Sequence, residues 1–340
     1  MPLLSDRRCL VVAPVLSACL VGCLAGPSSA LGGGPIGRAP NLREAELLKV
    51  PDSTRGVGFT IVSNRRDLLV ESRVELNGAA RAFDRLLGAR PENAEIRLTS
   101  DEKEVVVTIR IGARAAAAFS LPLGREDRGR GRISSPAMRV ASTVVLVMSR
   151  EWLSDFVREL VPGDTSSTGW LARERIPAWL RLGILQSVAE HPIHERWMAQ
   201  LARQRDAMPS VDDIFLASSC DAGCLARFGR VGTSDAANPD GLSDVVEIES
   251  GSPGDRAGFG RGRLPELDGR ARYLASTYAL VQFMAKREGP AYLRTLLTTA
   301  LTGGDMALAI GTARSFSAST SDIDRQWKVW LASYAFPGGR

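Results

Sequence analysis

The hydrophobic pattern of this sequence changes near residue 134, and that change constrains the fold more than any single motif. Before it, apolar and β-branched residues fall in short segments, which predict strands over 58–62, 94–99, 105–111 and 116–123 and one helix over 68–87. After it, apolar residues recur at helical spacing, which predicts helices over 138–160, 177–190, 193–205, 271–287, 290–301, 304–314 and 321–334. We therefore expect an α+β fold, in which a small N-terminal mixed sheet with a helix precedes a mainly helical region.

Capping residues mark the ends of two of these helices. Gly88 follows the helix over 68–87 and is typical of a C-cap. Ser134 and Ser135 precede the helix over 138–160, and a serine hydroxyl there can accept a hydrogen bond from the first turn. Pro136 fits that first turn, because proline lacks the N–H group that a helix start leaves unused.

The first 30 residues have the pattern of an export signal. Arg7 and Arg8 precede an almost wholly apolar run over 9–25. Within that run, Cys19 and Cys23 each end a short motif that resembles the lipobox of bacterial lipoproteins, in which the cysteine is lipidated. The small residues of 28–30 offer a competing cleavage site. We expect an exported protein, either a periplasmic or cell-envelope lipoprotein that touches the membrane only through this anchor, or a secreted one.

Composition shifts suggest the domain organisation. The segment 31–56 contains glycine and proline and predicts a linker after the signal. We expect one domain over 57–335, with a sheet-rich part over 57–132 and a helical part over 133–335.

The charge and the cysteines exclude some classes of partner. The net charge is +5, but the 43 basic residues are interleaved with 38 acidic ones, without the basic and aromatic stripe of a nucleic-acid binder. Beyond the signal, the cysteines are Cys220 and Cys224. In an oxidising compartment, two cysteines this close predict a small disulfide, since two thiols cannot complete a zinc site.

The helix over 138–160 carries the most specific chemical pattern. Arg150, Glu151 and Ser154 have the spacing of a His-Glu-x-x-His motif, in which two histidines bind zinc and the glutamate polarises a water molecule. The chain has two histidines, His191 and His194, and both lie outside this helix. The usual zinc site therefore cannot form here.

Several segments together resemble the peptidase-MA-like domains of gluzincin metallopeptidases. The resemblance rests on the helix of Glu151 and on three further segments in the expected order: Ala82-Phe-Asp-Arg-Leu-Leu-Gly-Ala-Arg-Pro91, Ile176-Pro-Ala-Trp-Leu-Arg-Leu-Gly-Ile-Leu185, and the C-terminal pattern of Tyr278-Ala-Leu-Val-Gln-Phe-Met and Trp327-Lys-Val-Trp. It covers roughly 57–335.

The resemblance implies a role for four positions. Glu151 matches the general base, Arg150 and Ser154 match the two histidine ligands, and Leu182 matches the third ligand, a glutamate. Zinc is the cofactor of this family, and all three of its ligands are replaced. Because a guanidinium stays protonated, Arg150 opposes a metal cation and suggests a fixed positive charge beside Glu151 in place of the metal. We therefore expect no metal cofactor.

These observations predict an exported, zinc-less pseudoenzyme that binds a peptide or protein in the former substrate cleft, or acts as a scaffold, at the cell envelope. The alternative is an active metallopeptidase or other hydrolase with a non-standard site, either at His191, His194 and Glu195 or by metal-free chemistry at Glu151. A third reading is a purely structural role, with the groove filled by Trp152, Trp179 and Leu182. A chance match within an ordinary amphipathic helix is the simplest alternative.

Overall fold

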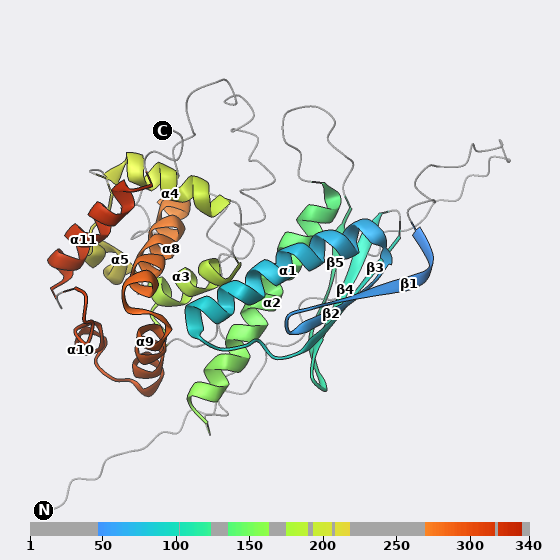
Figure 1. Cartoon of the computed structure of the whole chain (residues 1–340), viewed down its shortest axis with the longest axis horizontal. Helices are drawn as coiled ribbons and strands as arrows, with labels where there is room; N and C mark the ends of the chain where they lie inside the picture. The colour runs from blue at the N-terminus through green and yellow to red at the C-terminus, as the bar shows by residue number, and fades with distance from the viewer. Residues whose placement is uncertain are drawn as a thin grey trace, which may run out of the picture. The chain divides into compact units, whose positions relative to one another are not determined.

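The computed structural model describes residues 47–101, 103–123, 135–162, 175–189, 193–205, 208–217, 269–316 and 319–334. These residues confirm the α+β class, because a mixed sheet is built from the N-terminal half and most helices follow it (Figure 1). Within the described ranges, no helix is both long and apolar enough to span a membrane.

The sheet has five strands in the order β1-β2-β3-β4-β5. Their bounds are β1 (Leu47–Gly56), β2 (Phe59–Arg65), β3 (Ala94–Ser100), β4 (Glu104–Ile111) and β5 (Arg114–Pro122). β2 and β3 are parallel and are joined by helix α1 (Arg66–Leu87), whereas the other neighbouring strands are antiparallel. Side chains of β3 and β4 alternate between buried and more exposed, as expected when helices cover one face of a sheet.

Strand β1 lies within the segment 31–56 that the sequence predicted as linker, so the boundary at residue 57 is wrong. Pro51 favoured the prediction of a linker, because proline cannot donate a backbone hydrogen bond to a neighbouring strand. Proline is tolerated on an edge strand, and the pairing of β1 with β2 shifts register between Leu47 and Asp52, on either side of Pro51. The folded part therefore includes Leu47 and the residues that follow it.

The other helices are α2 (Pro136–Leu160), α3 (Ala178–Ala189), α4 (Ile193–Arg203), α5 (Val211–Leu216), α8 (Gly269–Glu288), α9 (Pro290–Thr302), α10 (Met306–Ile310) and α11 (Thr320–Ala332). The predicted cap of α2 is confirmed, since the Ser135 hydroxyl accepts a hydrogen bond from the N–H of Met138. Gly88 ends α1 with a φ of 60°. The predicted helix over 304–314 is shorter, and the six-residue α5 was not predicted because it is too short to show a period.

Two close contacts position the helices around the sheet. α1 packs on α2, where Phe83 meets Trp152 and Phe156 edge to face. α3 packs on α8 at Gly183, where a Cβ atom would lie 2.5 Å from the carbonyl oxygen of Thr277. Because α3 also contacts α1 and α2, one hydrophobic core runs from the sheet into the helices.

Candidate functional site

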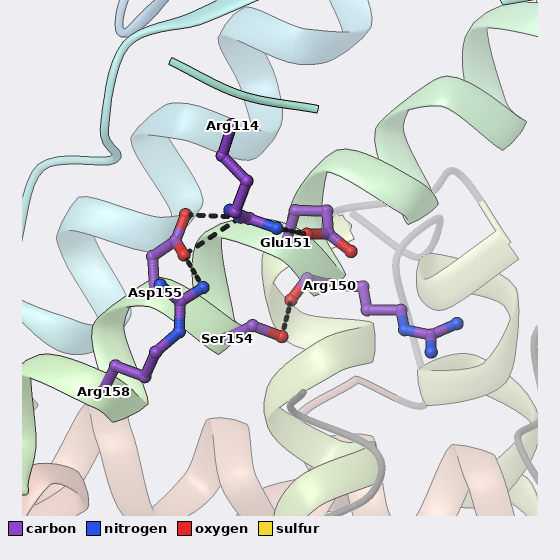
Figure 2. Close-up of polar contacts among 6 residues, drawn as sticks. All are labelled: Arg114, Arg150, Glu151, Ser154, Asp155 and Arg158. Atoms are coloured by element: carbon purple, nitrogen blue, oxygen red, sulfur yellow. Dashed lines mark hydrogen bonds and ion pairs between the residues drawn. The ribbon is translucent and has the colours of Figure 1, made fainter. Parts of the chain in front are cut away.

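Four charged side chains meet where β5 contacts α2, and we call them the Arg114 cluster: Arg114, Glu151, Asp155 and Arg158 (Figure 2). Nη1 of Arg114 donates to Oε2 of Glu151 at 3.1 Å. Nη2 of Arg114 donates to Oδ1 and Oδ2 of Asp155 at 3.1 and 3.3 Å. Arg158 also donates to Oδ1 of Asp155. One arginine from the sheet therefore joins two carboxylates of the helix.

The helix places the two carboxylates on one face. Glu151 and Asp155 are four residues apart in α2, so their side chains are neighbours on the helix surface. Two like charges at this spacing destabilise a helix. The guanidinium of Arg114 lies between them and offsets that repulsion, and Arg158, one turn further along, contributes a second positive charge.

A β-bulge directs Arg114 toward the helix. Ile109 pairs with Ala117 and Arg110 pairs with Ala115, so Ala116 has no partner in β4. If the side chains alternated regularly from Ala117 back to Arg114, Arg114 would lie on the outer face of the sheet. The bulge shifts the pairing by one residue, so Arg114 lies opposite Ile111, which is buried beneath the helices.

The environment of the cluster is partly desolvated. The side chain of Asp155 is 8% exposed and that of Glu151 is 16% exposed, whereas Arg114 is 41% exposed. Partial burial acts to lower the pKa of the Arg114 guanidinium, but the hydrogen bond to Glu151 and the charges of Asp155 and Glu151 outweigh it and raise the pKa. Arg114 is therefore a permanent cation, and the buried carboxylate of Asp155 receives hydrogen bonds from two arginines.

The positive charge beside Glu151 comes from a different residue than the sequence suggested. The sequence suggested Arg150 as the fixed cation beside this carboxylate, but Arg114 from β5 occupies that role. Figure 2 shows the Arg150 side chain extending away from Arg114 and Asp155. The Ser154 hydroxyl donates to the carbonyl oxygen of Arg150 at 2.9 Å, so it serves the hydrogen bonding of its own helix.

The position that the resemblance assigns to the third ligand is apolar and buried. Leu182 of α3 is 8% exposed and belongs to the same hydrophobic core as Trp152 and Trp179. Trp179 packs against Phe215 at a ring-centroid distance of 4.8 Å. An arginine, a hydrogen-bonded serine and a buried leucine offer no ligand set that fits zinc.

The alternative histidine site is not assembled by the described residues. His194 is buried, lies 3.1 Å from Oε1 of Gln186 through its Nε2, and stacks on Tyr278. The neighbouring Glu195 is exposed, and His191 lies outside the described residues. In the described ranges, no three His, Cys, Asp or Glu side chains are grouped closely enough to hold a metal ion. Cys19, Cys23, Cys220 and Cys224 also lie outside those ranges.

The two edges of the sheet differ in their chemistry. At β1, Pro51 and the register shift interrupt regular pairing, which is one way in which proteins protect an edge. β5 is the last strand on the other side, is nine residues long, and has no lysine or internal proline. Phe119 and Leu121 of β5 are partly buried and pack against the core. β5 is therefore the edge that is better suited to pair with an added strand.

Sequence reasoning missed Arg114 and Asp155. Asp155 had a signal, because it follows Glu151 by four residues in a predicted helix. Arg114 had none, since it precedes four alanines whose pattern does not indicate which face each residue takes.

Comparisons with known protein families, with curated proteins and with solved structures found no match.

Proposed function

We propose that this chain is an exported, zinc-less pseudoenzyme of the peptidase-MA-like kind, and that it binds an extended peptide segment of a partner along β5 at the cell envelope. The observation that carries the proposal is the ion pair between Arg114, the first residue of edge strand β5, and Glu151 of α2. The ion pair connects Glu151, which matches the general base of the family, to β5, the strand beside which a peptide would lie.

The ion pair argues against catalysis by Glu151. A general base must come within hydrogen-bond reach of the proton that it removes. Here Oε2 of Glu151 already accepts a hydrogen bond from a charged guanidinium. Arg150, Ser154 and Leu182 stand at the three ligand positions, so zinc-bound water is not expected to assist. These residues favour binding over hydrolysis.

The edge of β5 supplies a binding mode. An edge strand has unpaired backbone N–H and C=O groups, and an extended peptide can satisfy them by adding a strand to the sheet. The side chains of such a peptide would alternate between the two faces of the sheet. On the helix side they would approach Phe119 and Leu121, which are only partly buried.

The proposed location follows from the N-terminal signal. A lipid on Cys19 or Cys23 would hold the protein at the membrane surface, and cleavage after residue 30 would instead release it. Either form meets peptide segments of envelope or secreted proteins, so the proposed partner is a peptide or protein and not a nucleic acid.

Selection from a synthetic library of nonapeptides rich in Val, Thr and Ile tests the proposal, with the purified full-length chain as bait. We expect the wild-type chain to retain a subset of peptides without cleaving them. The variant with both Ala118→Lys and Ser120→Lys should lose them, because lysines on an edge strand disfavour strand addition. Both positions are on the exposed face, so folding should be kept.

Thr99→Lys is the matched control, since Thr99 is exposed on the interior strand β3. Equal retention by the control and the double variant would argue against the β5 edge. Cleavage of retained peptides, together with one bound zinc per chain in elemental analysis, would instead support the hydrolase alternative.

A further inference from the structure

A small residue separates two large ones on the inner face of β5. The side chains of this face lie opposite buried residues of β4, and they are those of Arg114, Ala117, Phe119 and Leu121. Ala117 packs against the core but is only partly buried. Because Ala117 has less volume than Arg114 or Phe119, a strand added to β5 can place a larger side chain beside it than beside its neighbours.

The guanidinium of Arg114 offers a surface for stacking. Its Nη1 and Nη2 donate to Glu151 and Asp155, and such hydrogen bonds lie in the plane of the group. They do not use its flat faces, and the side chain is 41% exposed. Arginine stacks on aromatic rings through these faces. A further carboxylate, in contrast, would compete with Glu151 and Asp155 for the same donors.

Phe119 offers a second contact for an aromatic ring. It is only partly buried, and within the described ranges no other ring contacts it. Aromatic rings on neighbouring strands attract each other in offset or edge-to-face arrangements. A peptide residue opposite Ala117 has Arg114 and Phe119 as its diagonal neighbours, and diagonal neighbours are within reach of an aromatic side chain.

We propose that the peptide that pairs with β5 carries an aromatic residue opposite Ala117, where its ring lies between the guanidinium of Arg114 and the ring of Phe119. Ala117 then determines specificity, because its small size admits the ring. This inference rests on the proposed function and names the class of ligand: an extended peptide with a Phe, Tyr or Trp residue among β-branched ones. A leucine at the same place would fill the space without the stacking contacts.

Affinity selection followed by mass spectrometry tests this inference on the full-length chain. Four versions of the nonapeptide library are used, in which the central residue is fixed as Phe, Tyr, Leu or Ala. The wild-type chain should retain the Phe and Tyr versions about five- to thirtyfold more strongly than the Leu version, as expected when the ring contacts both a cation and a second ring.

Ala117→Leu should lose this preference and still retain the Ala version, because the added leucine takes the place of the ring. Phe119→Leu keeps an apolar side chain and should reduce the preference by about two- to tenfold, since one ring is removed. Ala118→Leu is the matched control: it makes the same change at the next residue, which is exposed on the outer face, and it should keep the preference.

Three results would overturn the role of Ala117 and leave strand addition intact. The first is equal retention of the Phe and Leu versions by the wild-type chain. The second is a preference that neither Ala117→Leu nor Phe119→Leu changes. The third is an equal loss of the preference in Ala118→Leu, since the preference would then not come from the inner face. If no version of the library yields a retained peptide, both proposals are wrong.

Discussion

At the scale of single residues, Arg114 connects the sheet to the helix. Its guanidinium is the bridge between Glu151 and Asp155, which are 37 and 41 positions away along the chain. The cluster contributes to stability and organises the proposed binding site at once. A residue with both roles can be tested by its effect on unfolding before any ligand is known.

Replacement of Arg114 by methionine should destabilise the fold. The change keeps an apolar stem of similar length but leaves Glu151 and Asp155 to repel each other. Because Arg114 is 41% exposed, water compensates part of the loss, and we expect the free energy of unfolding to fall by about 1–2 kcal/mol.

Urea unfolding measures this effect, with a double-mutant cycle that includes Asp155→Asn. The two changes should be less than additive, because both remove the same interaction. An unchanged urea midpoint in Arg114→Met would mean that the bridge contributes nothing to the folded state.

Glu288 at the end of α8 gives a prediction about pH. Partial burial acts to raise its pKa, but hydrogen bonds from the N–H groups of Arg314 and Ser315 and from the Ser315 hydroxyl, and the charge of Arg314, outweigh it and lower the pKa. A lowered pKa in the folded state means that the stabilisation is present above the unfolded pKa and is lost as the pH falls through the folded pKa.

We therefore expect the free energy of unfolding to decrease on acidification from about pH 5 downwards, and to decrease less in Glu288→Gln. Urea unfolding at a series of pH values measures both slopes. Parallel curves for the two proteins would contradict the role of Glu288 in anchoring the loop at Arg314 and Ser315.

At the scale of elements, the bulge in β5 is the feature that builds the site. It changes the face on which Arg114 lies without changing the pairing of the strand beyond it. A bulge is a local irregularity with a long-range effect, because one extra residue inverts the orientation of every side chain on one side of it.

Deletion of Ala116 tests the register around the bulge. The extra residue would be gone, but Ala115 would still pair with Arg110 and Arg114 with Ile111, so the bridge to Glu151 should remain. Adding Arg114→Met to the deletion should therefore lower the free energy of unfolding by about 1–2 kcal/mol, as it does in the wild-type chain. A further change of less than about 0.5 kcal/mol in the combined variant would contradict this register.

The same elements explain what the sequence could and could not predict. Strands β2 to β5 and the long helices were predicted because their apolar periods are regular, and Ser135 and Gly88 marked their ends. β1 was missed because Pro51 suggests a linker, although an edge strand accepts it. The partner of Glu151 was missed because strand periodicity assumes no bulge, and Ala116 breaks that assumption.

At the scale of the whole molecule, the sheet, α2 and α3 form one core around the positions that resemble a zinc site. Leu182 and Trp152 fill that core with apolar side chains, and the charged residues gather at its rim between β5 and α2. An edge strand beside a cluster of paired charges is suited to bind a peptide, and we propose that β5 is the strand that binds it.

The decisive measurement is hydrogen–deuterium exchange of the full-length chain, with and without a nonapeptide retained in the library selection. We expect slower exchange of backbone amides in β5 and unchanged exchange in β1, the opposite edge of the sheet. Protection that appears elsewhere and leaves β5 unchanged would mean that the peptide binds without adding a strand to this sheet, and strand addition at β5 would then be wrong.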